Sequence, residues 1–202
     1  MCTRPHFISF FVKTCIAAQT FSISLGRALI FKMMNNPPNK LNVLILCTEN
    51  SARSIIAEGL FNHLGGNRLK AYSAGSNPTG EPNPYALKVL QNNGIETIFA
   101  KSKSWNYFAN DKSIEMDLVI TVCANAAGEV CPVWPGKPSG AHWGVADPAA
   151  LEGSDFEKLR CFQICFEQMK DRIITFLAGI EAGEEAKELA SKIEQMFPDR
   201  QF

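Results

Sequence analysis

The sequence predicts an α/β fold, a three-layer sandwich whose middle layer is a small, mostly parallel sheet of about four strands. Three observations predict it. Apolar runs alternate with segments of helical spacing, as in chains that form parallel sheets. The run at residues 41–47 is apolar at nearly every position, as expected for a strand buried on both faces. Two of the runs end in a cysteine, Cys47 and Cys123, and such strand ends meet at one edge of an open sheet.

The individual elements follow from residue spacing and from turn residues. Helices with apolar side chains three or four positions apart end at Gly65-Gly66 and at Gly94. A stretch rich in proline and glycine, residues 131–144, follows the third strand. The expected strands are 42–47, 69–74 and 117–123, with a short extended piece at 95–100, and the expected helices are 54–64, 85–93, 154–178 and 181–197.

Length and composition allow one well-packed domain and exclude some partners. The chain has 202 residues, of which 46% are hydrophobic, with 20 basic and 20 acidic residues. This balance predicts neither a nucleic-acid surface nor a polybasic membrane patch, and no apolar run approaches the length of a membrane span. We expect the main domain at residues 41–178 and a C-terminal amphipathic helix within 179–202.

Residues 1–40 differ from the rest because they contain no Asp or Glu and are rich in Phe and Ser. Three interpretations compete: a targeting segment, a poor signal peptide interrupted by Lys13, or sequence upstream of a true start at Met33 or Met34. We favour the misassigned start, and in each case expect a disordered extension outside the fold.

Seven cysteines are present, and their odd number and irregular spacing argue against a secreted disulfide framework. Functional thiols in the cytoplasm fit better. A zinc site is not expected, because no Cys-x2-Cys pair occurs and the three histidines are scattered. We expect no metal and no cofactor.

The segment from Cys47 to Ser54 is the strongest chemical signal. Cys47 and Arg53 are separated by five residues, between an expected strand and an expected helix. Backbone N–H groups and the helix dipole at such a junction bind anions, and an arginine fork can hold two anion oxygens. The same field is expected to lower the pKa of the Cys47 thiol and make it a nucleophile. The alternative is a buried structural cysteine followed by a surface arginine.

Two later features could complete such a site. Cys123 and Cys131 lie at the ends of a loop of small residues, where a movable thiol pair could exchange disulfides. Asp147, in the sequence His142-Trp143-Gly144-Val145-Ala146-Asp147-Pro148, could protonate a leaving oxygen. Unrelated loop cysteines and a simple Asp-Pro turn are the alternatives.

Together these motifs resemble the thioredoxin-coupled arsenate reductases, which share the fold of the low-molecular-weight protein tyrosine phosphatases. The matching positions, within residues 41–177, are Cys47, Arg53-Ser54, Glu58, Tyr72-Ser73-Ala74-Gly75, Cys123, Cys131-Pro132, His142-Trp143-Gly144 and Asp147-Pro148.

The resemblance implies a relay of three cysteines that reduces arsenate to arsenite, and so a role in arsenic detoxification. Cys47 would attack the bound arsenate, and Asp147 would protonate the departing hydroxide. Cys123 would then form a disulfide with Cys47, and Cys131 would transfer it to a Cys123–Cys131 pair. Thioredoxin, or glutaredoxin with glutathione, would reduce that bond. The residues implied to bind the oxyanion are Thr48, Glu49, Asn50, Ser51, Ala52, Arg53 and Ser54.

The chain also departs from its relatives. Glu49 stands where they often have glycine, and its carboxylate could oppose an anion. Some relatives bind potassium through residues matching Asn50, Glu58 and Ser73, but here Lys103 lies near the position of the acidic fourth partner. We therefore expect no potassium site, and expect Asn50 and Ser73 to brace the loop through hydrogen bonds.

Two other functions stay open. A low-molecular-weight tyrosine phosphatase would hydrolyse phosphate monoesters through a phosphocysteine at Cys47, using Arg53 and Asp147 but neither Cys123 nor Cys131. It would also need aromatic side chains beside the substrate, and the sequence offers no clear candidates. A non-enzymatic module that binds oxyanions or senses redox state is the third possibility, and a cradle blocked by Glu49 would support it.

Overall fold

Four parallel strands form a single sheet in the order β2–β1–β3–β4. The computed structural model describes residues 40–128 and 132–198. The strands are β1 (Leu41–Cys47), β2 (Leu69–Gly75), β3 (Leu118–Thr121) and β4 (Ser139–His142). The α/β fold with a small parallel sheet is therefore confirmed, and every strand pair is parallel.

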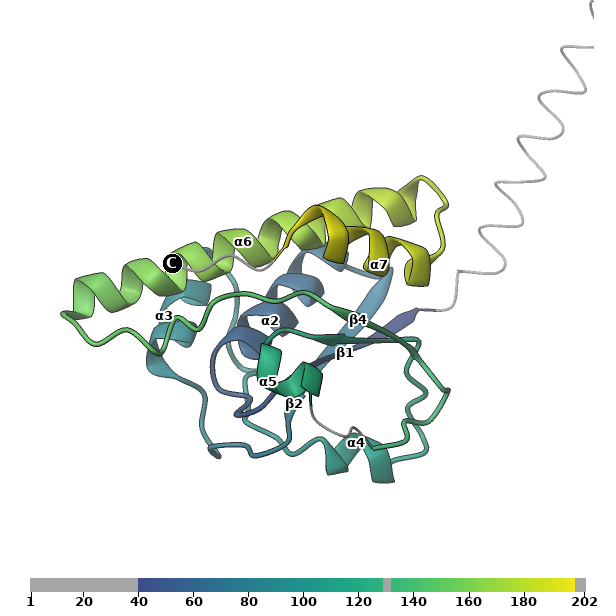
Figure 1. The fold of residues 1–202 in the computed structure, drawn as a ribbon, viewed down its shortest axis with the longest axis horizontal. Coiled ribbons are helices and arrows are strands. Elements are labelled where there is room, and N and C mark those ends of the chain that lie inside the picture. The colour runs from purple at the N-terminus through teal and green to yellow at the C-terminus, as the bar shows by residue number, and fades with distance from the viewer. Residues whose placement is uncertain (1–39, 129–131, 199–202) are drawn as a thin grey trace, which may run out of the picture. The chain divides into compact units, whose positions relative to one another are not determined.

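Alternate side chains of β1 point into two different cores, as the pleat of a strand requires. Val43 and Ile45 face the larger core, which lies beneath the helices α2 (Arg53–Gly65), α3 (Pro84–Asn92), α6 (Asp155–Glu181) and α7 (Ala186–Met196). Leu44 and Leu46 face a smaller core that includes Phe108 and Trp134. Figure 1 shows α6 and α7 side by side along one side of the sheet and the short helix α4 (Asn106–Asn110) on the other.

Local signals define both ends of the long helix α6. Ser154 caps its N-terminus, and the Ser154 and Glu157 side chains form a reciprocal capping box with the backbone. Gly183, with a φ of +85°, follows the helix in the left-handed conformation that glycine tolerates best. The chain then turns back into α7, whose side chains Leu189, Ala190 and Ile193 are buried in the larger core.

The fourth strand was not among the expected elements. We expected an extended piece at 95–100, but this segment is irregular and joins no strand of the described sheet. β4 instead lies within the Pro/Gly-rich stretch and pairs with β3, with Ser139 opposite Leu118 and His142 opposite Thr121. Its sequence, Ser-Gly-Ala-His, has no apolar alternation that would predict a strand. This edge strand is ordered by its pairing with β3 rather than by its own side chains.

Element boundaries also shift. β3 ends at Thr121, so Cys123 follows the strand and precedes the short helix α5 (Ala124–Gly128), which was not expected. The last helix begins at Ala186 rather than at residue 181, because α6 continues to Glu181. Residues 1–39 and Cys131 lie outside the described residues. No helix within 40–128 or 132–198 is long and apolar enough to cross a membrane.

Candidate active site

Three neighbouring strands each bring one predicted site residue to the same edge of the sheet. Cys47 is the last residue of β1, Cys123 lies two residues beyond β3, and Asp147 lies five residues beyond β4. Because β1, β3 and β4 are adjacent and parallel, their carboxyl ends meet at this edge. The structure therefore gathers residues 100 positions apart in the sequence around one point.

The residues from Cys47 to Ser54 form an anion cradle between β1 and α2. The Cys47 thiol is 4% exposed and accepts a hydrogen bond from the Asn50 backbone N–H at 3.1 Å. The Ser54 hydroxyl lies 2.9 Å from the same sulfur. α2 begins with Ala52 as its N-cap, which supplies no side-chain cap to the first amides of the helix. These amides stay available for an anion.

A cavity of about 90 Å³ opens above Cys47, and polar side chains dominate its lining. Five of the seven residues predicted to bind the oxyanion line it, whereas Asn50 and Ser54 are fully buried beneath. Asn125, in α5, lines the cavity but was not predicted, because nothing distinguishes it within a loop of small residues. The lining consists of Cys47, Thr48, Glu49, Ser51, Ala52, Arg53, Asn125 and Asp147.

Asp147 lies in the acid loop (residues 143–148), which contacts Arg53 twice. The Nη2 of Arg53 donates to Asp147 Oδ2 at 2.9 Å, and its Nη1 donates to the carbonyl of Val145 at 3.1 Å. A guanidinium has five N–H donors, so these contacts leave others for an anion. The guanidinium thus joins the cradle to the acid loop.

Cys123 is buried beside the cradle, 3% exposed. Its sulfur lies 3.7 Å from the Thr48 hydroxyl and accepts a hydrogen bond from the Ala126 backbone N–H at 3.4 Å. A charge on Cys123 would raise the pKa of Cys47, which places the two thiols within electrostatic reach of each other. The structure therefore describes a second buried cysteine near Cys47, and Cys131 lies outside the described residues.

Cys161 and Cys165 take no part in the cavity lining. Cys165 is fully buried in the larger core, and burial raises the pKa of its thiol to about 12. It is a packing residue of α6, as its helical spacing suggests.

Asn50 braces the cradle from below, as expected. It is fully buried and has a φ of +48°, a conformation that asparagine adopts more readily than most residues. Its Nδ2 donates to Ser54 Oγ at 2.9 Å and to Ser73 Oγ at 2.8 Å, and its Oδ1 accepts from the Lys103 backbone N–H at 2.6 Å. The side chain therefore ties the loop to α2, to β2 and to the segment after Ala100.

The bracing continues to a buried carboxylate. Ser73 donates its hydroxyl proton to Glu58, which is 5% exposed and lies 3.4 Å from the Lys103 ammonium. Burial raises the pKa of Glu58, and the charge of Lys103 opposes that rise. The described residues contain no cluster of three or more His, Cys, Asp or Glu placed to hold a metal ion.

Gly75 limits the space behind the cradle. A Cβ at this position would lie 2.4 Å from the Thr48 carbonyl oxygen and 2.9 Å from the Asn50 nitrogen. Only glycine allows β2 to approach the loop so closely. The sequence Tyr72-Ser73-Ala74-Gly75 is thus part of the cradle's support.

The pKa of Cys47 differs from our expectation. We predicted a lowered value, but burial of the thiol raises its pKa above the ordinary 9.0. The Ser54 hydroxyl, the Asn50 amide and the Arg53 charge all lower it, yet desolvation is the larger effect. The groups of the loop that lower the pKa can be recognised in the sequence. The desolvation of the buried thiol, which raises the pKa, depends on tertiary packing that the sequence does not reveal.

Comparisons with known proteins agree with this geometry. Residues 42–189 match the family model described as "Low molecular weight phosphotyrosine protein phosphatase". The arsenate reductase of Halalkalibacterium halodurans is 38% identical over 138 residues, which cover 68% of this chain and 96% of that protein.

Two solved structures share the fold and part of the sequence. An arsenate reductase in its phosphate-binding state is 27% identical, with a TM-score of 0.54 over 69% of this chain and 98% of that one. The thioredoxin-dependent arsenate reductase of Corynebacterium glutamicum is 28% identical, with a TM-score of 0.53 over 84% of this chain and 76% of that one. The chain belongs to the low molecular weight phosphotyrosine protein phosphatase family and, within it, to the arsenate reductases.

Proposed function

We propose that this member of the family reduces arsenate to arsenite through a relay of cysteines that starts at Cys47. The observation that carries the proposal is the second buried thiol, Cys123, beside the nucleophile. Transfer of an oxyanion group to water needs only one cysteine. Reduction needs a second thiol to take up the oxidation, and the edge of the sheet supplies it.

In the first step, the loop amides and Arg53 bind arsenate above Cys47. The Cys47 sulfur attacks arsenic, an arsenic–sulfur bond forms, and one oxygen leaves as water after Asp147 protonates it. Asn50 Nδ2 donates to Ser54 Oγ, which leaves the Ser54 hydroxyl proton free to point at Cys47. This directed hydrogen bond stabilises the thiolate as it forms, and so offsets part of the burial that raises the Cys47 pKa.

In the second step, the Cys123 thiolate attacks the Cys47 sulfur. A disulfide forms, the arsenic–sulfur bond breaks, and its electron pair reduces arsenic from the pentavalent to the trivalent state as arsenite leaves. Cys131 then attacks Cys123 and frees Cys47. Thioredoxin, or glutaredoxin with glutathione, reduces the resulting disulfide, and the cytoplasm is the compartment that keeps such thiols reduced.

A tyrosine phosphatase is the second candidate, because it would use the same nucleophile, arginine and acid. The cavity opposes it: among the described residues, none of the eight that line it is aromatic. An aryl ester would find no ring to stack on, whereas a bare tetrahedral oxyanion needs none. A purely binding module is also disfavoured, since Glu49 lines the cavity without filling it.

The deciding experiment follows NADPH consumption as arsenate is added to the purified chain. One arm contains thioredoxin and thioredoxin reductase, and the other contains glutaredoxin, glutathione and glutathione reductase. Arsenate-dependent turnover in either arm supports the proposal and identifies the reductant. Hydrolysis of an aryl phosphate, with no turnover in either arm, would select the phosphatase instead.

A further inference from the structure

We infer that the C-terminal helix α7 positions the general acid Asp147, an inference that rests on the proposed function. Helix α7 contacts the first part of the acid loop and the strand residue before it. α7 starts within the range 42–189 that matches the family model, but its two hydrogen-bonding residues, Ala190 and Glu194, lie just beyond it. Residues outside the matched range therefore support a group of the active site.

Two hydrogen bonds join α7 to the chain leading to Asp147. The indole Nε1–H of Trp143 donates to the Ala190 carbonyl at 3.0 Å. The backbone N–H of His142 donates to the Glu194 carboxylate at 3.0 Å. Trp143 is fully buried, so its N–H would lose a necessary partner without α7.

Arg172 adds a third connection from the long helix α6. Its Nη2 donates to the Gly144 carbonyl at 3.0 Å and to the Phe197 carbonyl at 3.1 Å. The guanidinium also lies over the Phe197 ring, 5.3 Å from its centroid. One buried arginine thus fixes both the acid loop and the residue that follows α7.

The loop has little freedom between these anchors and the active site. Only two residues, Val145 and Ala146, separate Gly144 from Asp147, and the Val145 carbonyl accepts a hydrogen bond from Arg53. Trp143 also packs against Phe61, which belongs to the same helix, α2, as Arg53; their rings stack 5.8 Å apart. Loss of the contacts with α7 would therefore let the acid loop shift and would move Asp147 relative to the anion site. Small errors in the position of a catalytic group reduce reaction rates strongly.

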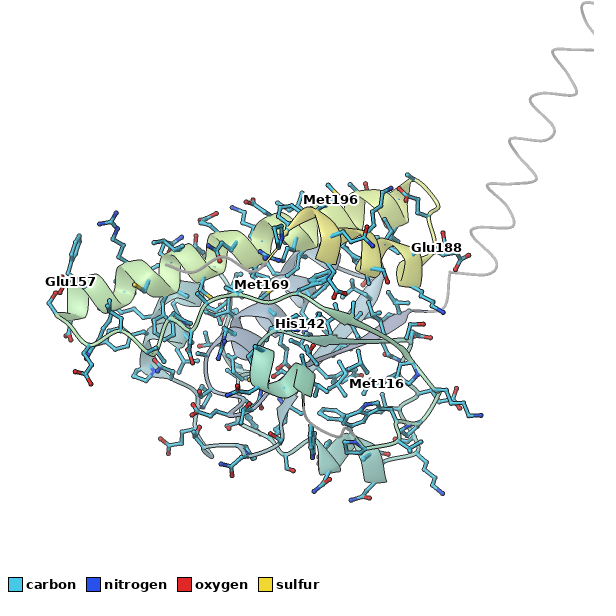
Figure 2. All side chains as sticks on the ribbon, in the orientation of Figure 1. Met116, His142, Glu157, Met169, Glu188 and Met196 are labelled. Atoms are coloured by element: carbon cyan, nitrogen blue, oxygen red, sulfur yellow. The ribbon has the colours of Figure 1, made fainter. Side chains whose placement is uncertain are left out.

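The contact at Glu194 offers a test with a matched control on the same helix. Glu194→Ala removes the acceptor for His142, and Trp143→Phe keeps the aromatic packing but removes the donor to Ala190. Glu188→Ala makes the same change as Glu194→Ala at an exposed position near the start of α7, away from His142 (Figure 2). Each variant is made in the full chain, alone and with Asp147→Asn.

Positioning predicts a specific pattern in the kinetics. Trp143→Phe combined with Glu194→Ala should lower kcat for arsenate by about tenfold, with the Kd for inorganic phosphate changed by less than about twofold. In the Asp147→Asn background the same pair should cost nothing further, because both changes act through one group. Glu188→Ala should behave as wild type. An equal loss in both backgrounds, or no loss in either, would overturn the inference.

Hydrogen exchange separates this inference from the proposed function. If the wild-type chain turned over neither arsenate nor an aryl phosphate, the proposed function would fail. The amide exchange rates of residues 143–147 would still show whether α7 holds the acid loop in place. Faster exchange there in the Trp143→Phe, Glu194→Ala chain, but not in Glu188→Ala, supports it. Unchanged exchange refutes it.

Discussion

The two sides of the cavity are built in different ways. The cradle side is local: Cys47, its hydrogen-bond donors Asn50 and Ser54, and Arg53 all lie within eight residues of one strand–loop–helix unit. The far side comes from segments much later in the chain, with Asn125 after β3 and Asp147 after β4, and Cys123 is buried two residues before Asn125. Under the proposed function, the cradle side (the near side) would bind the anion, and the segments of the far side would supply the second thiol and the acid. Binding and turnover should therefore respond separately to mutation.

Cys123→Ser should break the far side most completely. Multiple turnover should stop, because the thiol that attacks the Cys47–arsenic intermediate is gone, while one attack by Cys47 per chain stays possible. Rapid quenching followed by mass spectrometry should find at most one arsenic-bound Cys47 per chain and no released arsenite. Full turnover by this variant would show that Cys123 is not the resolving cysteine.

Asp147→Asn comes next in size. The amide still accepts a hydrogen bond from Arg53 but cannot donate a carboxylic proton, so the first chemical step should slow by about a hundredfold. Calorimetric titration with phosphate should show that anion binding persists. Loss of binding would instead give Asp147 a structural role and remove the distinction between the two sides.

The near side can be examined through the pH dependence of Cys47. Burial raises the pKa of this thiol above 9.0, so its alkylation by iodoacetamide without anion should keep accelerating as the pH rises past 9. Ser54→Ala removes a contact that lowers the pKa and should shift the profile further upward. Because the fold favours the neutral Cys47 thiol, this group contributes to the free energy of unfolding below pH 9. The contribution is lost as the pH rises through the pKa of Cys47 in the folded chain. A midpoint of the alkylation rate below pH 9 would contradict this account.

Glu49→Gln should have the smallest effect, and in the opposite direction. Glu49 is an exposed carboxylate on the wall of a cavity whose cation, Arg53, already pairs with Asp147. Removing its charge should tighten phosphate binding by no more than about tenfold, since solvent screens exposed charges. The gain should shrink in high salt. Weaker binding would mean that the hydrogen bond from Ser51 to Glu49 shapes the loop.

Sequence reasoning predicted the near side well and the far side in part. The spacing of Cys47 and Arg53 defines a local unit whose geometry follows from a strand end and a helix start. β4 was missed, because a strand of small residues is ordered by pairing with β3 and carries no pattern of its own. Asn125 was missed for a similar reason, since only tertiary placement brings it to the cavity.

The raised pKa of Cys47 shows a further limit of sequence reasoning. The loop motif reveals which groups favour the thiolate, but the desolvation of the sulfur depends on everything packed around it. The same applies to α7, whose amphipathic pattern predicted a helix but not its contact with Trp143.

Gly75 has a consequence for protein engineering. Because a Cβ there would meet the Thr48 carbonyl, variation at this position is coupled to the shape of the cradle although it lies 28 residues from Cys47. A randomised library that aims at larger oxyanions should keep residue 75 fixed and vary Glu49 or Asn125, whose side chains border open space. Clones that lose Gly75 should be depleted from such a library even when every residue of the cradle is intact.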